Sequence, residues 1–223
     1  SSDLLFEPER ASFISRCLFY PSSGNDVSLP VSLFLPVIDE FWFVDTSYRL
    51  TSPLLANRNL GLNLESFERL SFSGTTIRAK KEFEIPVQRE VYCHNITGRK
   101  IVVNVCRGRG YDLFRVAFRI PNKMISVFFY RGDSIGEPGS GFYWLKKPVI
   151  KFVLKHLEKN ALMISDGSNA IPQLSTFHKN FSIGQKAVYQ SKPFCIYQRR
   201  MECIDYLGER YGPTLVWKID AKG

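Results

Sequence analysis

The stretch Cys17-Leu-Phe-Tyr-Pro-Ser-Ser-Gly-Asn-Asp26, followed by Phe41-Trp-Phe-Val-Asp45, decides the fold of this chain. Residues 13–20 are mostly apolar and predict a strand, and residues 21–26 are turn formers that predict a loop. A helix is expected next, because Val31, Phe34, Leu35 and Ile38 share one helical face, with Pro30 in its first turn and Pro36 shortening it. A strand, a loop, a helix and a second strand in this order favour parallel pairing.

The middle of the chain predicts a different arrangement. Residues 64–72 are expected to form a short helix. Strands are expected at Thr75–Ile85, Arg89–His94 and Lys100–Cys106, with a turn at Asn95–Gly98 between the last two. We interpret residues 75–106 as a local antiparallel patch, either a β insertion or an extension of the sheet.

The last part of the chain returns to alternating strands and helices. An apolar strand is expected at Met124–Tyr130, a helix from Pro148 to about Glu158, and a strand at Ala161–Ser165. Cys195–Tyr206 and Tyr211–Ile219 predict a terminal antiparallel hairpin. The expected fold is a single α/β domain over residues 1–223. It has a Rossmann-type, mostly parallel sheet, a central antiparallel β insertion and a C-terminal antiparallel hairpin.

Composition narrows the class of protein. The 223 residues are 44% hydrophobic and 23% charged, which is typical of a globular protein, and no apolar run reaches the ~20 residues of a membrane span. The N-terminal residues lack a basic region and an apolar core, so we expect no signal peptide. Five cysteines without a CxxC pair favour a reducing, cytoplasmic environment, and with only three histidines we expect no metal site.

The order of elements around residues 17–45 resembles class I S-adenosylmethionine-dependent methyltransferases. The glycine motif is degenerate, because Ser22 and Asp26 stand where the family favours glycine and only Gly24 remains. The resemblance implies that the loop of Ser22, Ser23, Gly24 and Asp26 approaches S-adenosylmethionine, and that Asp45 accepts hydrogen bonds from the ribose hydroxyls. Two alternatives stay open: Asp45 caps the turn at Thr46-Ser47, and the loop residues cap the following helix.

Two further groups of residues are candidates for function. Asp133 follows a predicted strand and opens a glycine-containing loop, a position where open α/β sheets place their chemistry, so it is a candidate catalytic carboxylate; the alternative is a solvated turn. Lys147, Lys151, Lys155 and Lys159 recur every four residues, which predicts either a nucleic-acid-binding face of one helix or a solvated face. Arg107-Gly108-Arg109-Gly110 predicts either a segment that wraps a phosphate backbone or a loop, or a basic turn. The net charge of +9 favours acidic partners in general.

Two hypotheses follow. The first is a divergent methyltransferase-like enzyme that binds S-adenosylmethionine or a related nucleoside. The second is a catalytically inactive Rossmann-like module that binds nucleic acid or a protein partner. The sequence contains no G-x-x-x-x-G-K-[ST] phosphate loop, no G-x-S-x-G elbow and no H-E-x-x-H motif, which removes the commonest alternatives. The sequence leaves the substrate and the oligomeric state open.

Overall fold

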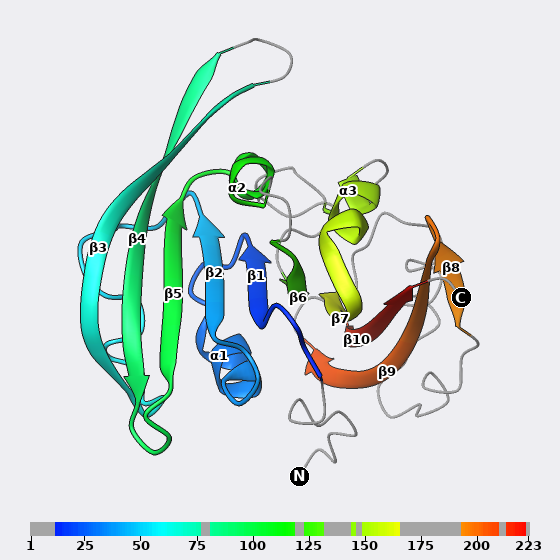
Figure 1. The fold of residues 1–223 in the computed structure, drawn as a ribbon, viewed down its shortest axis with the longest axis horizontal. Coiled ribbons are helices and arrows are strands. Elements are labelled where there is room, and N and C mark those ends of the chain that lie inside the picture. The colour runs from blue at the N-terminus through cyan, green and yellow to red at the C-terminus, as the bar shows by residue number, and fades with distance from the viewer. Residues whose placement is uncertain are drawn as a thin grey trace. The chain divides into compact units, whose positions relative to one another are not determined.

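The structure is a computed structural model that describes residues 12–76, 81–118, 123–131, 144–145, 149–165, 193–209 and 213–221. Two compact units are present (Figure 1): one comprises Ser15–Met124, and the other comprises Ser1–Ile14 with Ile125–Gly223. Each unit combines helices with a mixed sheet. The α/β class expected from the sequence is therefore confirmed.

The unit Ser15–Met124 contains a sheet with the strand order β3-β4-β5-β2-β1. Its elements are β1 (Cys17–Pro21), α1 (Ser28–Phe34), β2 (Glu40–Asp45), β3 (Leu62–Thr75), β4 (Glu82–His94), β5 (Lys100–Arg107) and α2 (Gly110–Ala117). The opening prediction is confirmed, because β1 and β2 pair in parallel, with Cys17 opposite Glu40. Strand β5 extends this parallel set on the other edge of β2, where Asp45 lies opposite Arg107.

The core of this unit consists of aromatic and branched side chains on the parallel strands. Every residue of β1 is buried, which explains its continuous apolar sequence. Phe19 of β1 packs edge-on against Phe114 and Phe118 at ring-centroid distances of 5.2 and 5.3 Å. These contacts fix α2 against the sheet.

The helix expected over residues 64–72 is wrong, because these residues belong to the 14-residue strand β3. Strand β3 pairs antiparallel with β4 along its whole length, and a bulge lies between Leu64 and Ser66. Leu64, Phe67 and Leu70 recur every three residues, as on a helix, but they are exposed. Pairing with β4 therefore outweighs the helical periodicity.

The antiparallel segment begins earlier than the expected residues 75–106, because it includes all of β3 from Leu62. The β3–β4 hairpin occupies the edge of the sheet and is inserted between β2 and β5 in the sequence. Strand β5 pairs antiparallel with β4 and parallel with β2, so it joins the hairpin to the parallel strands.

The second unit contains a sheet with the order β6-β7-β10-β9-β8. Its elements are β6 (Ile125–Tyr130), α3 (Val149–His156), β7 (Leu157–Ser165), β8 (Phe194–Ile196), β9 (Arg199–Glu209) and β10 (Pro213–Ala221). Strands β6 and β7 are parallel, and β10 is antiparallel to both β7 and β9. The terminal hairpin is confirmed. Its first expected strand is divided into β8 and β9 by a turn at Tyr197 and Gln198, which both have positive φ.

None of the described helices is long and apolar enough to cross a membrane. Among the described residues, no group of three or more His, Cys, Asp or Glu side chains is arranged to hold a metal ion.

Candidate functional site

The candidate site lies at the carboxyl edge of the first unit, which we define as the ends of β1, β2 and β5 at Pro21, Asp45 and Arg107. Open α/β sheets bind ligands outside the carboxyl ends of their parallel strands. All five candidate cofactor-binding residues belong to this edge. Ser22, Ser23, Gly24 and Asp26 follow β1, and Asp45 ends β2.

The loop after β1 is held directly against the end of β2. Ser22 and Gly24 both have positive φ, at 54° and 51°, so the backbone coils tightly between them. The Ser23 amide donates to the Val44 carbonyl at 3.2 Å, and the Gly24 amide donates to Asp45 Oδ2 at 3.0 Å. The sequence therefore folds loop and carboxylate into one hydrogen-bonded unit.

Asp45 also caps the turn that follows it. The Ser47 amide and hydroxyl both donate to Asp45 Oδ1, at 2.8 and 2.6 Å. The turn-capping alternative is thereby confirmed. A carboxylate offers about four acceptor positions. With two donors on Oδ1 and one on Oδ2, the half-buried Asp45 retains an acceptor position on Oδ2.

Tyr48 is a site residue that the sequence analysis missed. Its buried hydroxyl donates to the Gly24 carbonyl at 2.8 Å and lies 2.7 Å from the Ser23 hydroxyl, with which it shares a hydrogen bond. Burial raises the pKa of Tyr48 far above its usual range, so the hydroxyl keeps its proton and remains a donor. Its signal in the sequence is weak, being one aromatic residue in a polar segment.

Arg58 is the second residue that was missed, and it holds the far side of the loop. Its guanidinium donates to the Asn25 carbonyl at 3.3 Å and to the Ser28 hydroxyl at 2.7 Å. Asp26 is held from the opposite side, because the Tyr20 hydroxyl donates to its Oδ2 at 2.9 Å. The loop is thus preorganised by side chains from several segments before any ligand binds.

Gly24 leaves Asp45 accessible from one direction. A Cβ atom added at Gly24 would lie 4.0 Å from Asp45 Oδ2, an ordinary contact distance. A larger side chain at this position would therefore extend over the carboxylate oxygen that still has an acceptor position.

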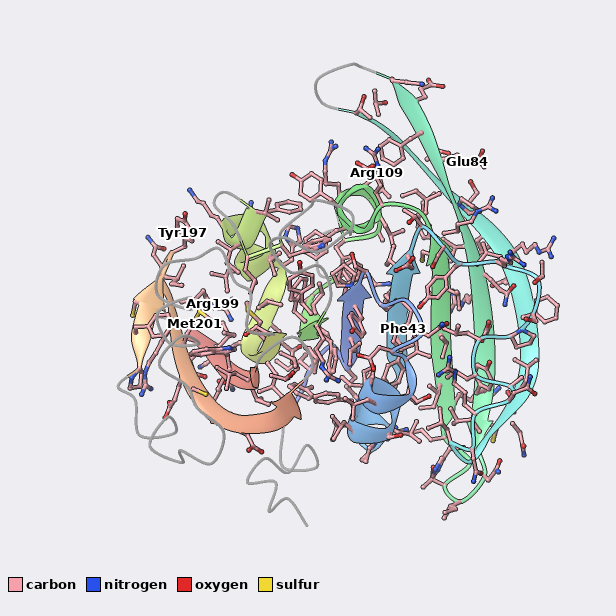
Figure 2. All side chains as sticks on the ribbon, turned by 180° about the vertical axis from the view of Figure 1, so that it is seen from behind. Phe43, Glu84, Arg109, Tyr197, Arg199 and Met201 are labelled. Atoms are coloured by element: carbon pink, nitrogen blue, oxygen red, sulfur yellow. The ribbon has the colours of Figure 1, made fainter. Side chains whose placement is uncertain are left out.

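The basic segment Arg107-Gly108-Arg109-Gly110 joins the same edge. The Gly108 amide donates to the Asp45 backbone carbonyl at 3.2 Å, and α2 begins directly after Arg109. Figure 2 shows Arg109 beside α2, and both arginines are exposed to solvent. Arg107 ends β5 and Gly110 begins α2, so the segment is the short connection between a strand and a helix, and it is held next to Asp45.

The lysines that recur every four residues do not share one helical face. Lys151 and Lys155 are exposed on α3, but α3 ends at His156 and Lys159 belongs to β7. The helix stops there because Leu157 pairs with Ile125 in the parallel ladder. Lys151 also lies 5.8 Å from the centre of the Tyr197 ring. Lys147 and the candidate catalytic residue Asp133 lie outside the described residues.

Comparisons with protein-family models, with curated proteins and with solved structures found no match for this chain.

Proposed function

We propose that the carboxyl edge of β1, β2 and β5 binds a nucleoside-type ligand, with S-adenosylmethionine as the first candidate. The chain is then a divergent methyltransferase-like protein. The observation that carries the proposal is the parallel order β5-β2-β1, with Asp45 at the end of β2 against the coiled loop after β1. In doubly wound sheets this half binds a nucleotide, with the loop after the first strand near the ligand and an acidic residue on the ribose.

The hydrogen bonds of Asp45 support a ribose-binding role. Two donors from Ser47 and one from Gly24 orient the carboxylate, and the remaining acceptor position on Oδ2 suits a hydroxyl donor. Because the loop is already ordered, binding does not carry the entropic cost of ordering it. The same features fit adenosine-type ligands other than S-adenosylmethionine.

A thermal-shift experiment with S-adenosylmethionine and S-adenosylhomocysteine tests the proposal. A ligand at about 100 times its Kd stabilises the folded state by about 2.7 kcal/mol. For a chain of this length, that corresponds to a Tm increase of roughly 5–10 °C. Absence of a shift with either ligand at millimolar concentration contradicts the proposal.

Two variants locate the binding site. Asp45→Asn removes a carboxylate acceptor and is expected to weaken binding about 10-fold, the loss of one charge-assisted hydrogen bond. The matched control is Ser47→Ala, which removes a donor to Oδ1 of the same carboxylate and leaves Oδ2 unchanged. Calorimetric titration of both variants checks the role. Equal affinities for Asp45→Asn and Ser47→Ala would mean that Asp45 acts only as a turn cap.

A second candidate function is the inactive binding module. It is favoured by the fact that three of the acceptor positions of Asp45 are already occupied by the chain itself. This candidate predicts a folded, cooperative protein that neither nucleoside ligand stabilises. The thermal-shift experiment therefore separates the two.

A further inference from the structure

Within the described part of the chain, basic side chains are neutralised at one edge of the parallel strands and lack ion pairs at the other. At the amino edge, where β1, β2 and β5 begin, carboxylates neutralise the neighbouring cations. The ion pairs there are Arg16–Asp39 at 2.8 Å, Arg99–Asp39 at 3.1 Å and Lys123–Glu40 at 2.9 Å.

The carboxyl edge has the opposite character. Arg49, Arg107, Arg109 and Arg115 form no ion pair among the residues that the structure describes, and the first three are exposed. The nearby carboxylates Asp26 and Asp45 accept hydrogen bonds from the Tyr20 hydroxyl and the Gly24 amide, and Asp112 lies between Arg109 and Arg115 in the first turn of α2. We call these four arginines the arginine edge.

The arginine edge is contributed by separate segments brought together by the sheet. Arg49 follows β2, Arg107 ends β5, and Arg109 and Arg115 lie at the two ends of α2. The backbone bond between Gly108 and Asp45 fixes the β5–α2 turn beside the end of β2. Arg109 and Arg115 are six residues apart, or about 9 Å along the helix axis, so their backbones present the two charges at separate points of α2.

The β3–β4 hairpin extends past the same edge (Figure 1). The last pair between β4 and β5 is Val87 with Cys106, whereas pairing of β3 with β4 continues to Thr75 and Glu82. Helix α2 contacts this overhang, because a Cβ atom at Gly74 would meet Val116 Cγ1 at 2.7 Å. The overhang, which carries the exposed Glu82 and Glu84, therefore stands beside α2 at this edge.

We propose that the arginine edge binds the phosphate backbone of a single-stranded nucleic acid. All four cations are arginines, whose planar guanidinium groups match phosphate oxygens two at a time. Their spacing suits a ligand with several phosphates better than one free nucleotide. A strand bound here lies along the edge proposed for the nucleoside, but this inference does not depend on that site being occupied.

Fluorescence anisotropy with labelled single-stranded RNA and DNA tests the inference. The wild-type chain is expected to bind both at low salt, with affinity that falls as salt rises. Each lost contact to a single strand reduces the slope of log K against log salt by about 0.7, so Arg107→Gln with Arg109→Gln is expected to reduce it by about 1.4. Arg107→Lys with Arg109→Lys is expected to retain most of the slope and to bind more weakly.

The matched control is Lys151→Gln with Lys155→Gln, which removes the same charge from the exposed face of α3. Its binding is expected to equal that of the wild type. The inference is overturned by absence of wild-type binding at low salt, by equal effects of the two glutamine variants, or by a polyglutamate peptide that competes as well as RNA.

A failure here is distinguishable from a failure of the proposed function. The single variant Arg109→Gln, which lies outside the three strand ends that define the nucleoside site, is expected to show the same thermal shift with S-adenosylhomocysteine as the wild type. Loss of that shift, with strand binding unchanged, would place the arginines in the nucleoside site and overturn the inference.

Discussion

Glu90 is a carboxylic acid enclosed by the protein without a basic partner among the described residues. It lies on β4, where its Oε1 accepts from the Leu54 amide at 2.8 Å and from Gln88 Nε2 at 2.6 Å. The Tyr92 hydroxyl donates to the other oxygen. Burial raises the pKa of Glu90 above its ordinary 4.5, although the three donors act in the opposite direction. Glu90 thus ties the segment after β2 to the sheet.

A raised pKa makes this contribution depend on pH with a known sign. The folded state holds a proton on Glu90 more strongly than the unfolded chain does. The stability from Glu90 is therefore complete below pH 4.5 and is lost as pH rises through the raised pKa. Relative to Glu90→Gln, the wild-type free energy of unfolding is expected to fall between about pH 4 and about pH 8. The free energy of unfolding falls by about 1.4 kcal/mol for each tenfold increase in the proton affinity of Glu90 that folding causes.

Urea denaturation of the wild type and Glu90→Gln at both pH values checks this prediction, because other titrating groups cancel in the difference. Glu68→Gln on exposed β3 is the control for the substitution itself. A difference between wild type and Glu90→Gln that also stays constant would contradict the burial argument.

At the scale of elements, Arg199 connects one helix to two strands. Its guanidinium donates to the backbone carbonyls of Leu154, Leu157, Glu158, Ile219 and Asp220, at 2.6–3.3 Å. These carbonyls include those at the end of α3, which a helix leaves without partners. One side chain from β9 therefore closes α3 against β7 and β10.

Arg199→Lys is expected to lower the free energy of unfolding by about 2–3 kcal/mol, because an ammonium cannot reach carbonyls spread over a planar fork. Arg200→Lys is the matched control. Arg200 pairs with the carboxylates of Glu202 and Asp220 at the protein surface, where such pairs contribute less than about 1 kcal/mol. Chemical denaturation compares the two. Similar losses for both variants would show that the carbonyl contacts of Arg199 contribute little.

Local sequence predicted the elements in which the apolar residues of the sequence are also the buried residues of the structure. Strands β1 and β2 are buried and read as continuous apolar runs, so their order and parallel pairing were predictable. Strand β3 was not predictable from local sequence. Its exposed Leu64, Phe67 and Leu70 have the spacing of a helix, and only the pairing with β4 makes the segment a strand. Helix α2 was missed because it begins at Gly110, a residue that usually marks a turn.

The residues of the candidate site also fall into those that the sequence predicted and those that it did not. Asp45 and the Ser22–Asp26 loop were identified from their order along the chain. Tyr48 and Arg58 were not, because they reach the loop only through the excursion of the chain between β2 and β3. The sequence suggested a phosphate-binding role for Arg107 and Arg109, but it could not show that Asp26 and Asp45 accept hydrogen bonds from Tyr20 and Gly24.

At the scale of the whole molecule, the five cysteines report on burial in both units. Cys17, Cys106 and Cys203 are buried, Cys93 is half-buried and Cys195 is exposed, and all five are free thiols. Burial raises the pKa of Cys203 to about 12 and that of Cys106 well above its usual range, so neither forms the reactive thiolate near neutral pH.

Alkylation of the native protein is therefore expected to modify Cys195 rapidly and Cys93 slowly, and to leave the three buried thiols unmodified. All five are expected to react in denaturant. Peptide mass spectrometry over a time course identifies each site. A Cys195→Ser variant is the control: it is expected to show no fast labelling, which would assign the fast reaction to Cys195. If Cys17 or Cys106 reacted at the rate of Cys195 in the native protein, the parallel strands that carry Asp45 would be open to solvent, and the packing that preorganises the proposed site would be contradicted.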